Sequence, residues 1–205
     1  TLLNFRELEY EFKLNTFRNE DDIKLHFHSD IIKPILLEVN HSMVHQYRSE
    51  DVLRAGGRTD ATFQVITFEF KKENRFDSES GIREALYGRD ERDHGLYDYI
   101  ISNSGITSDD DEAAVVKKLS AGIGVGFDGK HFIFARFITS PRKHDISTAK
   151  TTIKISWPIN LDFYYEIKDF QSGLKRLALL LKQQEKIALT KQNVLSVINA
   201  KSEFV

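Results

Sequence analysis

The run VITFEFK over residues 65–71 constrains this chain more than any other segment. Its β-branched and aromatic residues are those that favour a buried strand. Successive side chains of a strand point to opposite faces, so Phe68 and Phe70 face one layer while Glu69 and Lys71 project together from the other. Because an unpaired buried charge is costly, a core strand with these residues needs a partner or a ligand for its charges.

A third charged residue precedes this run. Asp60 follows the turn-forming segment 55–57, and residues 59–71 read as extended structure. If the chain turns near Phe63 and Gln64, Asp60 returns beside Glu69. Two carboxylates and the Lys71 ammonium then converge.

Two interpretations of this convergence compete. In the functional one, Asp60 and Glu69 bind Mg²⁺, a hard cation that takes oxygen ligands, and Lys71 positions a water or stabilises charge on a phosphate. In the structural one, Glu69 and Lys71 form an ordinary ion pair on the solvated face of an edge strand. Glu-x-Lys alone favours the edge strand. The added Gly-Arg-Thr-Asp turn at residues 57–60, with its spacing, favours the metal site.

The segment from Gly56 to Lys72 resembles the PD-(D/E)xK nuclease motif. Its Gly-Arg-x-Asp form is that of the N-terminal nuclease domains of type I restriction motor subunits and related restriction-modification proteins. The resemblance implies that Asp60, Glu69 and Lys71 are catalytic, with Asp60 and Glu69 holding metal and Lys71 assisting attack. It also implies Mg²⁺ as the cofactor, with Mn²⁺ as a substitute, and DNA as the substrate.

The resemblance extends over roughly residues 18–138. An acidic residue often opens a helix in this family that ends in an apolar Pro-x-Leu-Leu segment, and Glu20 with residues 34–37 is similar. This implies Glu20 as a further metal ligand, although a favourable interaction with the helix dipole explains Glu20 equally well. Glu38 is a weaker substitute.

The chain departs from the family at one point. The Gln-x-x-x-Tyr motif that follows the lysine in many relatives is not clear here. Glu84, or the segment around Tyr97 and Tyr99, would have to take its place in positioning DNA.

Hydrophobic periodicity and turn residues predict the remaining elements. Their order predicts an α/β fold, a restriction-endonuclease-like core in which a mixed central β-sheet is flanked by helices. The glycines at 122, 124 and 126 are expected to be small residues packed under a helix. The expected helices span 20–38 with a kink at Pro34, 80–87, 96–102, 113–119, and a helical pattern from Phe163 with a restart at Thr190; the expected late strands span 121–127, 131–138 and 152–157.

Length and composition predict a folded protein. The chain has 205 residues, 40% apolar and 29% charged, which is typical of a globular domain. We expect one nuclease-like domain over residues 1–205, with its core at about 18–138. Residues 151–205 would pack on that core or dock a missing domain. Because the chain opens at Thr1 without a methionine, we expect further domains or subunits of a larger restriction or defence protein.

Charge and cysteine content limit the partners. The chain has no cysteine, which excludes disulfides and thiolate metal sites, and no apolar run long enough for a membrane span, so we expect a cytoplasmic protein without a membrane partner. A net charge of −2 argues against a whole-surface nucleic-acid binder but permits a local basic patch. Candidates for that patch are Lys13, Arg18, Arg54, Arg58, Arg75 and residues 142–144.

Together these patterns predict a Mg²⁺-dependent endonuclease domain that hydrolyses DNA phosphodiester bonds. The alternative is an inactive module with the nuclease fold that binds DNA or a partner protein without cleavage.

Overall fold

Six strands form one mixed sheet in which the spatial order follows the chain order, β1-β2-β3-β4-β5-β6. The computed structural model describes residues 4–39, 44, 46–52, 58–90, 93–145 and 158–188. Strands β3 and β4 run parallel, and every other neighbouring pair is antiparallel. The strands are β1 Arg48–Val52, β2 Arg58–Phe63, β3 Ile66–Phe70, β4 Ile123–Phe127, β5 His131–Asp145 and β6 Pro158–Asp169.

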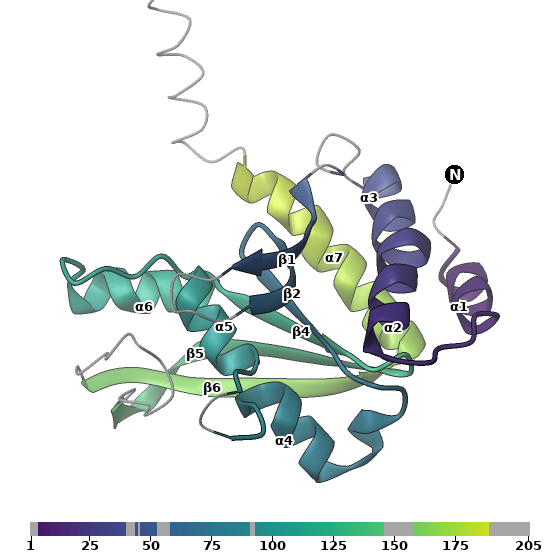
Figure 1. The fold of residues 1–205 in the computed structure, drawn as a ribbon. Helices are drawn as coiled ribbons and strands as arrows, with labels where there is room; N and C mark the ends of the chain where they lie inside the picture. The colour runs from purple at the N-terminus through teal and green to yellow at the C-terminus, as the bar shows by residue number, and fades with distance from the viewer. Residues whose placement is uncertain are drawn as a thin grey trace, which may run out of the picture.

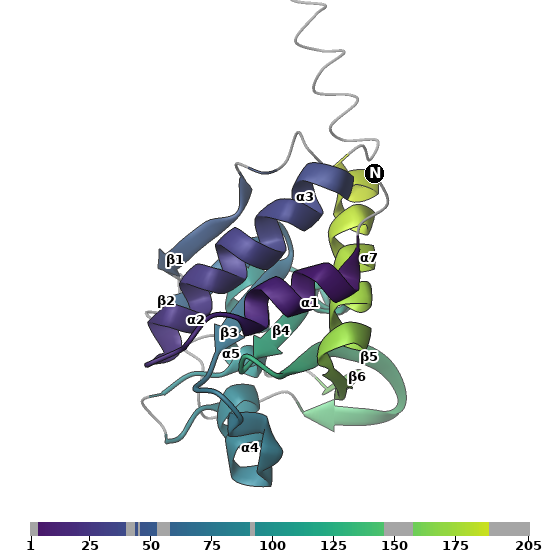
Figure 2. The ribbon, with the colours of Figure 1, turned by 90° about the vertical axis from the view of Figure 1, so that its right-hand side faces the viewer.

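Helices cover both faces of the sheet, as Figures 1 and 2 show. One layer holds α1 (Phe5–Lys13), α2 (Glu20–His26), α3 (Lys33–Val39) and α7 (Phe170–Ala188), and the other holds α4 (Glu79–Tyr87), α5 (Leu96–Asn103) and α6 (Glu112–Ala121). A separate apolar cluster fills the space on each side of the sheet. The α/β class and the mixed, helix-flanked sheet predicted from the sequence are therefore confirmed.

Strand alternation decides which layer each β3 side chain enters. Phe68 and Phe70 are buried in the cluster under α2, α3 and α7. Each contributes about 1.5–3 kcal/mol by that burial. Thr67 and Glu69 alternate with them and so face the layer of α4 and α5. The predicted division of the two faces is confirmed.

The predicted helix over 20–38 is confirmed, with an irregular middle. Helix α2 continues into the π-helical segment η1 (Phe27–Ile32) and then into α3, so the helical stretch ends at Val39. In the π-helical turn the Lys33 N–H donates to the carbonyl of His28, five residues back. Pro34 follows in the first turn of α3. Proline has no N–H to donate to a helical carbonyl, and the wider π-helical turn just before it accommodates the missing hydrogen bond.

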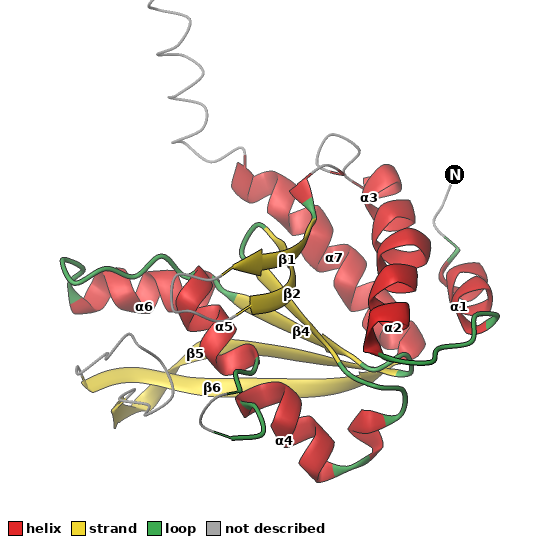
Figure 3. Cartoon of the chain, viewed as in Figure 1, coloured by secondary structure: helices red, strands yellow, loops and turns green. Residues whose placement is uncertain are grey.

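The predicted late hairpin is confirmed by β4 and β5, which Figure 3 shows as adjacent strands. Asp128 is fully buried at its turn and accepts from the backbone N–H groups of Phe76 and His131, each at 2.7 Å. Gly124 lies against α5, because a Cβ there would approach Leu96 and Ile100 to about 3.1 Å. The expectation of small residues under a helix is confirmed at this position.

The predicted helix from Phe163 is wrong at its start. Residues up to Asp169 belong to β6, which pairs with β5, and α7 begins at Phe170. The apolar spacing of Leu174, Leu177 and Leu181 is helical, but it does not extend back over the aromatic and β-branched residues of β6, which favour a strand. The expected strand 152–157 and the restart at Thr190 lie outside the described residues.

Helix α7 completes the core. Its Phe170, Leu174, Leu177 and Leu181 are buried in the same cluster as Phe68. This part of the C-terminal region therefore packs on the sheet. Among the described helices, none is long and apolar enough to cross a membrane.

Candidate active site

The β2–β3 hairpin brings Asp60 back to Glu69, as its spacing predicts. The hairpin turns at Gln64, which adopts a left-handed φ of 56°. Ala61 pairs with Phe68, and continuing this register places Asp60 opposite Glu69. Asp60 Oδ2 accepts a hydrogen bond of 2.7 Å from the backbone N–H of Phe70, which holds the carboxylate at the end of the ladder.

Glu69 and Lys71 form a buried ion pair. Lys71 Nζ lies 2.7 Å from Glu69 Oε1, and the two side chains are only 6% and 7% exposed. Strand β3 lies between β2 and β4, so it is not an edge strand. The interpretation of these residues as a solvated pair on an edge strand is therefore wrong.

The two carboxylates are held in conditions that oppose their ionisation. Burial, followed by the charge of Asp60, raises the pKa of Glu69 to about 8, against the opposing effect of Lys71. Burial also raises the pKa of Asp60, although the N–H of Phe70 and the ammonium of Lys24 oppose the change. Both shifts indicate a place where a proton or a cation is needed to balance the negative charge.

Lys71 stays an ammonium in these surroundings. Burial alone would lower its pKa, but Glu69, then Glu84 and Glu20, raise it above the ordinary value. A lysine with a raised pKa cannot serve as a general base near neutral pH. Its chemistry is that of a fixed positive charge.

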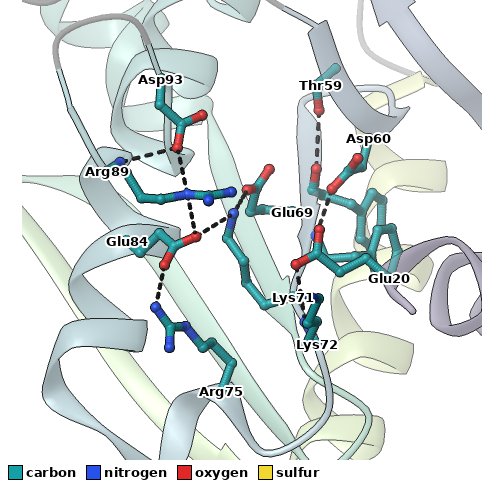
Figure 4. A network of polar contacts seen from close by, with 12 residues as sticks. Glu20, Thr59, Asp60, Glu69, Lys71, Lys72, Arg75, Glu84, Arg89 and Asp93 are labelled. Carbon is teal, nitrogen blue, oxygen red and sulfur yellow. Dashed lines mark hydrogen bonds and ion pairs between the residues drawn. The ribbon is translucent and has the colours of Figure 1, made fainter. Parts of the chain in front are cut away.

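A second set of charges surrounds Glu84 (Figure 4). This buried residue of α4 lies 3.5 Å from Lys71, and its carboxylate also binds Arg75 at 2.6 Å and Arg89 at 3.0 Å. Arg89 in turn contacts Asp93 at 3.6 Å. Salt bridges thus connect Lys71 to two arginines that are 44% and 68% exposed.

Sequence reasoning did not identify Arg89 or Asp93. Their signal is weak, because they lie around the end of α4 in a polar segment without a motif. Gly88 ends that helix with φ 76°, and a Cβ there would come within 2.3 Å of the Asp93 carbonyl oxygen. A tight turn of this kind brings Asp93 back to Arg89, whose backbone N–H donates to it at 3.1 Å.

Glu20 is the first residue of α2 and lies beside the trio of Asp60, Glu69 and Lys71. Its Oε1 accepts from the backbone N–H of Lys72 at 3.3 Å, and its charge contributes to the raised pKa of Lys71. From the same helix, Lys24 reaches Asp60 Oδ1 at 3.7 Å. Glu38 is exposed near the far end of the helical stretch, roughly 25 Å along its axis from Glu20. The role of Glu20 as a metal ligand stays a prediction.

Only some of the residues predicted to position DNA lie at the site. Glu84 contacts Lys71, and Tyr99 is buried close enough to Glu69 and Asp60 that burial and then these charges raise its pKa. Of the proposed basic patch, Arg75 lies at the site, whereas Lys13 and Arg18 pair with Glu9 and Asp22. Arg54 lies outside the described residues, and the side chains of Arg58 and residues 142–144 are not described.

The carboxylate oxygens of Asp60 and Glu69 are suitable ligands for a hard cation, but they are only two residues. Asp60 and Glu69 offer carboxylate oxygens, and the Asp60 side chain is 34% exposed, so the pair is open to a ligand on one side. Among the residues that the structure describes, no group of three or more acidic or histidine side chains is arranged to hold an ion. Mg²⁺ usually keeps several waters, so a site with two carboxylates is chemically sufficient.

Comparisons with family models, curated proteins and solved structures found no match to this chain.

Proposed function

We propose that this chain is a metal-dependent nuclease that hydrolyses phosphodiester bonds of DNA. The observation that carries this proposal is the convergence of Asp60 on β2 with the buried pair of Glu69 on β3 and Lys71 just after it. Asp60 and Glu69, two carboxylates with raised pKa values, lie beside the ammonium groups of Lys24 and Lys71. Burial disfavours the charged forms of both carboxylates, and a bound cation would offset that cost. The mixed sheet with helices on both faces agrees with the proposed restriction-endonuclease-like core.

Asp60 and Glu69 would hold the metal, and Mg²⁺ or Mn²⁺ fits their oxygens. The bound ion would neutralise charge on the phosphate and lower the pKa of a water molecule. The protein contributes the position of the carboxylates. The N–H of Phe70 fixes Asp60, and Lys71 fixes Glu69.

Lys71 stabilises the charge that develops on the phosphate oxygens. In hydrolysis a water oxygen forms a bond to phosphorus, the phosphorus–oxygen bond to one sugar breaks, and the leaving oxygen gains a proton while the water loses one. The negative charge grows on the oxygens of the phosphoryl group meanwhile. An ammonium held in a poorly solvated site by Glu69 and Glu84 is already oriented for that charge.

The same proposal extends to the protein or complex in which this chain would act. We infer that the chain serves as the nuclease module of a cytoplasmic restriction or defence protein, with further domains or subunits supplying specificity. The sequence contains no recognisable motif dedicated to reading bases, which is why specificity is assigned to other parts of the proposed assembly.

One observation favours the alternative, a module that binds DNA or a partner without cutting. Lys71 is paired with both Glu69 and Glu84, and Glu84 is also bound by two arginines, so the cluster is largely paired without any ligand. A stable charge network of this kind is compatible with a nuclease fold that has lost its activity.

Nicking of supercoiled plasmid separates the two functions. The wild-type protein is incubated with plasmid in Mg²⁺, in Mn²⁺ and in EDTA, next to Asp60→Asn. The nuclease converts supercoiled to nicked or linear DNA only with metal, and Asp60→Asn does not. A wild-type protein that shifts DNA mobility with no cleavage in either metal would support the binding module instead.

A further inference from the structure

Arg75 and Arg89 meet on one carboxylate from two different elements. Arg75 lies in the short turn η3 (Arg75–Asp77) and Arg89 follows the end of α4, yet both bind Glu84. Lys71 also reaches this carboxylate. Three cations therefore surround Glu84 (Figure 4), and two of them, Arg75 and Arg89, are 44% and 68% exposed.

The charges divide the site into two poles. Asp60 and Glu69 form an acidic pole, which fits a cation. Lys71, Arg75 and Arg89 form a basic pole around Glu84. A ligand that binds both poles has a cation for the two carboxylates and more than one negative group for the basic residues. A polynucleotide strand with a bound metal ion has both.

Exposure allows the two arginines to change partners. Their side chains are 44% and 68% exposed, whereas Glu84 is 8% exposed, so solvent and a ligand reach the guanidinium side of each ion pair. Guanidinium groups bind phosphate through paired N–H donors, so a phosphodiester can replace Glu84 as their acceptor. Lys71 is buried and stays with Glu69 and Glu84.

We propose that Arg75 and Arg89 form a clamp for the phosphates that flank the bond to be cleaved. The inference rests on the proposed function, since it takes the ligand to be DNA. It narrows the substrate class to polynucleotide strands with neighbouring phosphates, rather than isolated phosphodiesters. Glu84 is then a positioning residue that holds both arginines and Lys71 in place before the substrate arrives.

The backbone supports the position of each arginine. Buried Asp128 accepts from the N–H of Phe76 and so ties η3 to the β4–β5 turn. On the other side, Asp93 accepts from the backbone N–H of Arg89. Both anchors restrict the main chain of the clamp while the guanidinium groups remain exposed.

Salt-dependent DNA binding tests the clamp without requiring cleavage. A fluorescent duplex of about 20 base pairs is titrated in EDTA at several salt concentrations. Each phosphate contact adds about 0.9 to the slope of log affinity against log salt. Arg75→Gln and Arg89→Gln are each expected to bind several-fold more weakly and to reduce that slope by about 0.9, whereas Arg75→Lys and Arg89→Lys retain most of it.

Arg136→Gln is the matched control. Arg136 is an exposed arginine of β5 that lies near Arg176 and Leu180 of α7, on the opposite face of the sheet. Its loss changes the net charge equally but should leave the slope unchanged. The clamp is overturned if both glutamine variants keep the wild-type slope, if Arg136→Gln loses as much, or if the wild-type protein does not bind the duplex at low salt.

Hydrolysis of bis(4-nitrophenyl) phosphate separates the clamp from the proposed function. This probe has one phosphodiester and no flanking phosphate. With Mn²⁺, Arg75→Gln and Arg89→Gln should lower kcat/KM for DNA by a larger factor than kcat/KM for this probe. If the wild-type protein hydrolyses neither substrate but its DNA binding depends on both arginines, the nuclease proposal fails, whereas the binding of strand phosphates by Arg75 and Arg89 stands. If Asp60→Asn abolishes DNA cleavage and the arginine variants cut like wild type, the clamp alone fails.

Discussion

The Nζ of Lys71 lies 2.7 Å from Oε1 of Glu69, in the interior of the sheet. The same ammonium faces Glu84 at 3.5 Å. One positive charge therefore balances parts of two buried negative charges. This arrangement makes the stability of the protein depend on Lys71, on pH and on any cation that joins the site.

Lys71→Met should destabilise the metal-free protein by about 3 kcal/mol at pH 8.5, because it leaves two buried carboxylates without their shared ammonium. The cost should shrink toward acid pH as Glu69 takes up a proton. Urea denaturation at two pH values measures both effects. Lys130→Met is the control. Its pair with Asp77 is 47% exposed on each side, so its loss should cost less than about 1 kcal/mol, and equal costs for the two variants would argue against a buried pair.

The free energy of unfolding of the metal-free protein should fall as pH rises from about 5 to 8. Glu69 has a pKa of about 8 in the folded protein and an ordinary value of 4.5, so the folded state holds more protons in this window. Stability then decreases with pH, by up to about 1.4 kcal/mol per pH unit for one proton. Glu69→Gln should show a flatter dependence in the same urea titrations. Parallel curves for the two proteins would contradict the raised pKa.

Mg²⁺ or Mn²⁺ should raise the melting temperature, because an ion that binds only the folded carboxylate pair shifts the folding equilibrium. The rise should grow with pH up to about 8, since the ion competes with the proton on Glu69. Asp60→Asn keeps an oxygen acceptor for the N–H of Phe70 and removes the charge, so most of the rise should disappear. Asp77→Asn removes an exposed carboxylate away from the proposed metal ligands, so this variant should show the same metal-induced rise in melting temperature as wild type. The same rise in Asp60→Asn and wild type would place the metal elsewhere.

Gly88→Ala should disturb the turn that positions Arg89. Gly88 has φ 76°, and an added Cβ would lie 2.3 Å from the Asp93 carbonyl oxygen. Gly105→Ala is a close control, because Gly105 has φ 68° with no atom within 4 Å. Both variants incur the conformational strain of about 1 kcal/mol, but Gly88→Ala adds a backbone clash. Thermal melts should show a larger loss for Gly88→Ala, and equal losses would mean that the turn relaxes freely.

The local sequence pattern was sufficient to predict much of the fold and the convergence of Asp60, Glu69 and Lys71. The alternation in β3 predicted which side chains face each layer, and the turn near Gln64 was predicted from spacing alone. Both depend on neighbours in the chain. The boundary between β6 and α7 was wrong because aromatic residues before Phe170 continue an apolar pattern, and only pairing with β5 decides that they extend as a strand.

The surroundings of the trio could not be predicted in the same way. That β3 lies inside the sheet depends on its pairing with β4, more than 50 residues later in the chain. Arg89 reaches Glu84 through a turn whose geometry is set at Gly88, and Lys24 reaches Asp60 from a separate helix. Such contacts join residues that share no periodicity, so a single sequence carries little trace of them.

Metal affinity and single-turnover DNA cleavage, measured together on Asp60→Asn, Glu69→Gln and Lys71→Met, decide whether these three residues form a metal-dependent nuclease site. Variants that remain folded by circular dichroism are compared with wild type at one pH. We predict that Asp60→Asn and Glu69→Gln lose metal binding and cleavage together, whereas Lys71→Met still binds metal and cuts about 10²-fold more slowly. Cleavage at the wild-type rate by any of the three variants, or no cleavage by the wild-type protein with Mg²⁺ or Mn²⁺, would contradict the proposed nuclease site.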